Sequence, residues 1–273
     1  MTAPSDDVAG EAAALLAALT ESAERARSRS GSSGDPAGPV GTADADQADP
    51  SAMARLASLT GAAGRSARSA GVGAVASGHW LAQTVVDVGQ QLPLRPRDGL
   101  VARYGGLSED RLADALIRSA ARVSASVGAM VGAVVAAEVM LPPTWVVLPL
   151  EILVETALVA GVEMKLIGEL HEVYGRPVPA DHGPRAYLLG RAWAERRGVG
   201  PALVVAGTPA LAGTLGYEAR REVIVLVRRR LVRRAGINLG GLAPFFVGAA
   251  AGATLNGRAT RRLGETVKGD LRP

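Results

Sequence analysis

The sequence predicts an all-α protein: a helical bundle with apolar hairpins rich in glycine and alanine, preceded by a disordered N-terminal tail. Hydrophobic residues make up 48% of the 273 residues but aromatic residues only 3%, so the apolar content is mainly Ala, Leu and Val. Ala and Leu favour helices. The run VIVLV at 223–227 is the only β-like segment, and the arginines on both sides place it in a helical pattern.

Residues 1–50 are predicted to form the tail. Val8 to about Ala26 is rich in Ala, Leu and Glu and can form a short helix. From Arg27 to Pro50 the chain is mostly Ser, Gly, Asp and Pro. Such a segment buries too little apolar surface to offset the entropy of ordering, so we expect it to be disordered.

Residues 51–107 are predicted to be a weakly helical region and linker. Helical pieces are expected over Met53–Leu59 and Val72–Val88, with several glycines interrupting them. Prolines 93 and 96 are expected to end the region.

The ordered core is predicted over residues 108–273 and begins with a helix capped by Ser108. Ser108 precedes an acidic first turn, which favours a helix N-terminus. The helix carries an apolar stripe and then becomes apolar all round, with no charge from Val123 to Ala137.

A tight turn at Pro142–Pro143 is expected to lead into a second helix, from Trp145 to about Tyr174. Gly175 is its expected stop. Its charges, with Glu163 as the exception, share one side of a helical wheel, which predicts a roughly amphipathic helix beyond the apolar start. These residues are Glu151, Glu155, Lys165, Glu169 and Glu172.

Further helices are expected over 184–197 and from Thr208-Pro209 to Gly236. Two other uncharged stretches cover 198–217 and 235–257, the latter interrupted by Pro244.

A spanning helix needs about 20 mostly apolar residues. Three arrangements fit: a spanning helical hairpin, a bundle lying in the membrane interface, and a soluble bundle whose apolar helices bury one another.

Two arginine clusters flank the 235–257 stretch and predict contact with anionic lipid, since cations beside apolar segments attract the anionic leaflet. They are Arg228, Arg229, Arg230, Arg233 and Arg234, and then Arg258, Arg261 and Arg262. A single span places one cluster outside, against the positive-inside rule, so a hairpin or surface-lying arrangement is favoured. The alternative is an ordinary solvated charged face. The cluster lacks interleaved aromatic residues, so we expect no nucleic-acid partner.

No catalytic constellation stands out. The absence of cysteine excludes disulfides, thiolate zinc sites and cysteine nucleophiles. We expect no metal and no cofactor, since the three histidines lack ligand spacing and no phosphate-binding loop is present. Glu151 and Glu155, one helical turn apart, are the weak catalytic candidates, and a solvated or salt-bridged pair is the ordinary alternative.

Small residues recur every four positions at Pro244, Gly248 and Gly252 and end in Asn256, a pattern suited to close helix packing. Together with Tyr174-Gly175 closing an earlier apolar helix, this segment resembles the EcsC family of bacterial proteins over roughly residues 108–272. The resemblance implies a helical, membrane-linked bacterial protein. It implies no catalytic residues.

The function expected is therefore that of a non-enzymatic, membrane-associated helical protein that docks lipid or a membrane protein. A soluble helical scaffold or regulator with a dry core is the alternative, and a lipid-directed enzyme using Glu151 and Glu155 is a weaker one. Oligomerisation through the Gly/Ala helices is also open. The acidic N-terminus lacks the apolar segment of a secretory signal, so we expect the cytoplasmic side of the membrane or, alternatively, the soluble cytoplasm.

Overall fold

A computed structural model describes residues 4–31, 50–71, 79–139, 148–197 and 244–272. Within these ranges the chain forms eight α-helices and no strand, which confirms the all-α prediction. The helices are α1 (Pro4–Gly31), α2 (Pro50–Ala70), α4 (His79–Gln91), α5 (Arg97–Arg103), α6 (Glu109–Val139), α7 (Leu148–Val173), α8 (His182–Arg197) and α11 (Pro244–Leu271).

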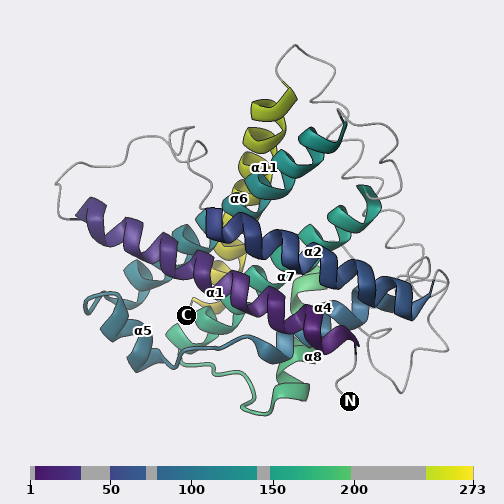
Figure 1. The fold of residues 1–273 in the computed structure, drawn as a ribbon. Coiled ribbons are helices and arrows are strands. Elements are labelled where there is room, and N and C mark those ends of the chain that lie inside the picture. Colours follow the sequence, from purple (N-terminus) through teal and green to yellow (C-terminus); the bar gives the residue numbers. More distant parts are fainter. Residues whose placement is uncertain (1–3, 32–49, 72–78, 140–147, 198–243, 273) are drawn as a thin grey trace.

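Helix α7 is the centre of the bundle (Figure 1). It packs against α6, α4, α8 and α11, and every residue from Glu151 to Met164 is buried. The expectation of an amphipathic helix was wrong, because its glutamates face other helices rather than solvent. Glu155, Glu163 and Glu169 are all less than 4% exposed. The apolar content of α7 therefore reflects burial by protein on all sides.

Helices α6 and α11 form the most extensive helix pair in the described chain and run antiparallel. Contacts pair Asp114 with Lys268 and Gly128 with Gly252, so residue numbers rise along one helix as they fall along the other. A Cβ atom added to either glycine would lie closer than 3.0 Å to the backbone of the other. The close crossing therefore requires glycine on both helices.

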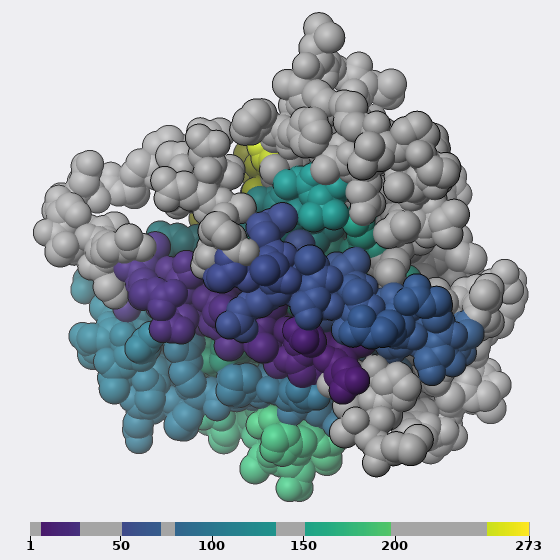
Figure 2. Space-filling model, in the orientation of Figure 1, coloured from purple at the N-terminus to yellow at the C-terminus, as the bar shows by residue number. Residues whose placement is uncertain are grey.

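The N-terminal residues do not form a detached tail. Helix α1 is longer than the predicted helix and extends through Arg27 to Gly31, and it lies with α2 across one face of the molecule (Figure 2). Its apolar side chains recur at helical spacing and are buried in the common core. They include Val8, Ala12, Leu15, Leu16 and Leu19. Residues 32–49 of the predicted tail lie outside the described residues.

Helix α2 also differs from expectation, since it continues through Gly61 and Gly64 and ends at Ala70. Gly71 follows with a φ of 86°, a left-handed conformation that glycine adopts without strain. Helix α4 ends at Gln91, ahead of Pro93 as expected. The short helix α5 between Pro96 and Tyr104 was not foreseen.

The predicted ends of the core helices agree with the structure more closely. Helix α6 begins directly after Ser108, and Gly175, with a φ of 67°, follows the end of α7. Helix α11 begins at Pro244, within the 235–257 stretch, and residues 235–243 lie outside the described residues. The Pro142–Pro143 turn, the 198–217 stretch and the predicted helix from 208 to 236 lie outside the described residues.

Among the described helices, none combines the length and the sustained apolar character that crossing a bilayer requires. The expected spanning hairpin therefore lacks support in helices α6 and α7. Both helices are long enough, but α6 carries charges through its first half and α7 carries them along its length.

Candidate functional site

Three arginines on the outer side of α11 are open to solvent. Arg258, Arg261 and Arg262 are exposed and form no ion pair with any residue that the structure describes. Their spacing of three and four residues places them within about one helical turn of one another. They therefore concentrate positive charge on a short length of α11.

Helix α6 contributes three more exposed arginines. Arg111, Arg118 and Arg122 are separated by seven and four residues, so they share one side of the helix. Because α7 packs against both α6 and α11, the exposed arginines of both helices lie on the side away from it. We call this set the basic face: Arg111, Arg118, Arg122, Arg258, Arg261 and Arg262.

Few carboxylates oppose this charge. Asp114 of α6 pairs with Lys268 at 2.7 Å, and Asp270 of α11 pairs with Arg196 at 3.0 Å. Glu265 is then the acidic residue of α11 without an ion pair in the described part of the chain. Glu109 and Asp110 of α6 are paired as well, with Arg97 and with Lys268 and Arg272. Because these carboxylates are matched by other cations, the six arginines leave the basic face with a net positive potential.

On both helices the arginines stop at the same distance from the glycine crossing. Arg122 is six residues before Gly128, and Arg258 is six residues after Gly252, so both lie about 9 Å to the same side of the glycine crossing. Beyond them α6 is uncharged to Ala137 and α11 is uncharged back to Pro244. We call residues 123–139 of α6 and 244–257 of α11 the tip, where the two helices extend side by side beyond the other described helices (Figure 1).

The predicted packing motif lies along this part of α11. Pro244 is the first residue of the helix, Gly248 follows one turn later, and Gly252 forms the crossing with Gly128. Asn256 is 8% exposed and its Nδ2 donates to Oε1 of Glu155 at 2.8 Å. The motif thus joins α11 to both α6 and α7.

The two weak catalytic candidates are inside this packing. Glu151 and Glu155 are 3% and 2% exposed, and neither lines the cavity found among the described residues.

A third glutamate holds four helices together. Glu163 is fully buried and accepts hydrogen bonds from Nε1 of Trp193 at 2.8 Å and from Oγ1 of Thr260 at 2.6 Å. Arg197 forms a two-point ion pair with the same carboxylate. Because the carboxylate can only accept, Thr260 donates to it and in turn accepts from the Ser124 hydroxyl, 2.8 Å away. This network is fully satisfied and therefore structural.

A second buried network ties α1 to α7. Arg95 donates to Glu169 at 2.9 Å and to Glu24 of α1 at 2.7 Å, and Arg103 binds the other oxygen of Glu24 at 2.9 Å. Lys165 also donates to Glu169 at 2.7 Å. Burial raises the pKa of Glu24, but hydrogen bonds and charge from Arg95 and Arg103 outweigh it and lower the pKa below 4.5.

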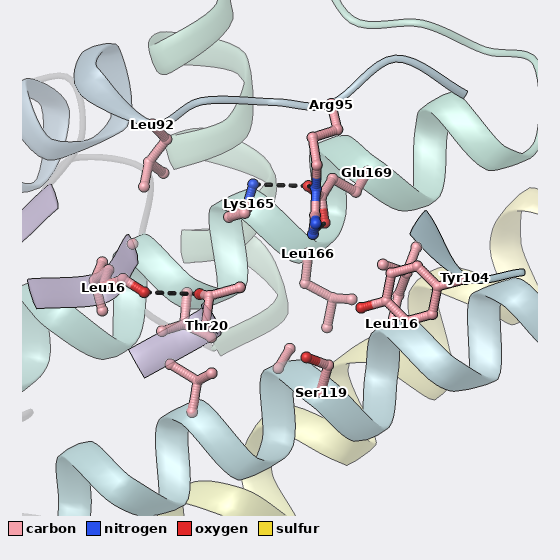
Figure 3. Close-up of a pocket in the computed structure, with 14 residues that line it drawn as sticks. Leu16, Thr20, Leu92, Arg95, Tyr104, Leu116, Ser119, Lys165, Leu166 and Glu169 are labelled. Atoms are coloured by element: carbon pink, nitrogen blue, oxygen red, sulfur yellow. Dashed lines mark hydrogen bonds and ion pairs between the residues drawn. The ribbon is translucent and has the colours of Figure 1, made fainter. Parts of the chain in front are cut away.

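This network closes one end of a small cavity between α1, α6 and α7 (Figure 3). Its volume is about 30 Å³, which suits about two water molecules. Four leucines, two valines and one alanine form the apolar part of the wall, and Tyr104, Ser119 and Thr20 add hydroxyl groups. The cavity is too small for a lipid chain or an organic substrate.

The described histidines form no metal centre. His171 and His182 contact backbone carbonyls of Arg176 and Gln90 at 3.1 and 2.8 Å. In the ranges that the structure describes, no group of three or more His, Asp or Glu side chains is arranged to hold a metal ion.

Comparison with known proteins adds no relative: no family model, no curated protein and no solved structure matches the chain. Sequence reasoning singled out Arg258, Arg261 and Arg262 but not the arginines of α6. The helical spacing of Arg111, Arg118 and Arg122 was visible, yet only the pairing of α6 with α11 places them beside the others. The cluster at 228–234 lies outside the described residues.

Proposed function

We propose that the protein docks on anionic membrane surfaces through the basic face. The observation that carries this proposal is the set of six exposed arginines on α6 and α11, opposed by little acidic charge. Each cation near an anionic membrane surface contributes about 1 kcal/mol of attraction, so six of them suffice for reversible binding. The cytoplasmic leaflet, which carries the anionic lipids, is the surface that fits.

A nucleic acid is also anionic, but the basic face offers no aromatic side chain on which bases stack. Apart from Glu138 at its far end, the adjoining tip is uncharged, which suits the apolar part of a bilayer rather than a phosphate backbone. The resemblance of residues 108–272 to the EcsC family, with its membrane link, stays a prediction that agrees with this proposal.

Sedimentation with lipid vesicles tests the proposal. The full chain is expected to sediment with vesicles that contain phosphatidylglycerol and not with pure phosphatidylcholine, and high salt should release it. Replacing Arg258, Arg261 and Arg262 with Gln removes about 3 kcal/mol of attraction and should weaken partitioning roughly 100-fold.

A matched variant controls for net charge. Arg25→Gln, Arg55→Gln and Arg191→Gln together remove three exposed arginines from α1, α2 and α8, away from the basic face. This control should bind nearly as well as the wild type. Equal losses in both triple variants would contradict a specific docking face, and absence of binding to anionic vesicles would favour the soluble scaffold instead.

A further inference from the structure

We infer that the tip enters the interfacial layer of the bilayer while the basic face stays at the lipid phosphates. This inference rests on the proposed function. It adds how deeply the protein enters the bilayer and which end of the bundle faces the lipid. It commits to one contact, the paired ends of α6 and α11, and leaves the rest of the bundle outside the membrane.

The position of the charges supports this orientation. The last arginines before the tip, Arg122 and Arg258, lie at one level on the two helices, and the uncharged segments of both helices start at that level. Arginine binds phosphate through several N–H groups, and an apolar segment next to it favours the acyl boundary. Charge and apolarity therefore change at the same height on both helices, as at a membrane interface.

The hydrogen bonds made by polar groups in the tip support insertion independently. The exposed hydroxyls of Ser126 and Thr254 donate to carbonyls four residues earlier in their own helices, those of Arg122 and Ala250, at 3.1 and 2.7 Å. The buried groups Ser124 and Asn256 are bonded to Thr260 and Glu155. Because bilayer hydrocarbon offers no hydrogen-bond partners, internally satisfied polar groups lower the free energy of insertion.

The length of the tip makes the insertion shallow. The α11 part, residues 244–257, is about 21 Å long at 1.5 Å per residue, shorter than the hydrocarbon core of about 30 Å. Glu138 lies near the far end of α6, which also opposes deep entry. The tip therefore reaches the headgroup and upper acyl region, as interfacial helices do.

Because the chain has no cysteine, single cysteines can report this depth. Ser126→Cys and Thr254→Cys place a fluorescent NBD label on the tip. Thr266→Cys is the matched control, since Thr266 is exposed on α11 and bonds the carbonyl of Arg262, four residues earlier, but lies on the other side of the arginines. The full-length labelled proteins are mixed with phosphatidylglycerol vesicles, with and without nitroxide-bearing lipid.

We expect the labels at 126 and 254 to shift to shorter emission wavelength and to be quenched by nitroxide in the upper acyl chain, with no change at 266. Binding without any shift overturns insertion but leaves the docking proposal standing. Equal shifts at all three sites also overturn the inference, since the helices would then lie flat. No binding overturns the proposed function and the inference together.

A pair of charge substitutions gives a second test without a label. Thr254→Asp and Thr266→Asp make the same change of charge on the same helix, but only the first puts a carboxylate in the tip. We expect Thr254→Asp to weaken partitioning more than 10-fold beyond Thr266→Asp, because a buried charge is costly in lipid. The difference should persist in moderate salt, since desolvation is not screened. Equal effects of the two variants contradict insertion of the tip.

Discussion

Gly128 of α6 and Gly252 of α11 contact each other backbone to backbone, so that a Cβ atom on either would lie closer than 3.0 Å to the other's carbonyl oxygen. Asn256 is also in this contact, with its Nδ2 2.7 Å from the position of a Cβ on Gly128. The crossing brings two helices together that are far apart in the sequence, and the tip and the basic face depend on it.

The first prediction concerns this crossing. Gly252→Ala or Gly128→Ala should lower the free energy of unfolding by about 2 kcal/mol, because neither backbone can move away from the added methyl group without separating the helices. Urea denaturation followed by circular dichroism measures the loss. Gly269→Ala is the control, since Gly269 lies in the same helix with open space around it. It should be neutral or stabilise by up to about 1 kcal/mol.

The second prediction concerns the Glu163 network. Glu163→Gln should lower the free energy of unfolding by about 3 kcal/mol, since the buried Trp193 and the half-buried Arg197 lose the charge of their acceptor. Glu195→Gln breaks the exposed pair with Arg191 and should change stability by less than about 1 kcal/mol. Similar losses in the two variants, measured by urea denaturation, would refute a structural role for Glu163.

The third prediction concerns acid sensitivity. The pKa of Glu24 is lower in the folded protein than its ordinary value of 4.5. Its contribution to stability is therefore complete above about pH 4.5 and is lost as the pH falls through the folded pKa. Thermal melts at pH 7 and at pH 3.5 should show a larger decrease for the wild type than for Glu24→Gln. Parallel decreases in the two proteins would show that Glu24 does not contribute.

The fourth prediction concerns Tyr174, whose hydroxyl donates to Oδ1 of Asp110 at 3.0 Å. Burial and then Asp110 raise the pKa of Tyr174 to about 12. Since the folded pKa is raised, this contribution to stability is present below about pH 10 and is lost as the pH rises through about 12. Absorbance at 295 nm should lose its highest titration step in Tyr174→Phe, and Asp110→Asn should move that step to lower pH.

The sequence predicted those parts of the fold that depend on neighbouring residues. Ser108 and the acids after it start α6, and Gly175 follows α7, because caps and stops act over a few residues. The four-residue spacing that links Gly252 to Asn256 predicted a packing surface in the same way, and both residues lie in helix contacts. Each of these patterns lies within a single helical segment of the sequence and does not depend on a distant partner.

What the sequence did not reveal depends on partners far along the chain. Glu155 and Glu169 of α7 looked like part of a solvated side, but they are bonded to Asn256 and Arg95. Glu163, which the helical wheel placed apart from that side, is bonded to Arg197. Helix α1 looked like part of a tail because polar residues follow it, although its leucines recur at helical spacing. Charges that are paired across helices cannot be told from solvated charges by helical periodicity alone.

The pairing of α6 with α11 also sets an order of events during synthesis. Residues 140–243 separate the two helices, so at about 5–20 residues per second α6 leaves the ribosome roughly 5–20 s before its main partner. Through that interval the glycine side of α6 is uncovered, and contacts between such distant segments form slowly. The side of α6 that faces α11 is therefore buried only after α11 has been synthesised, whereas its contacts with α1 and α7 can form earlier.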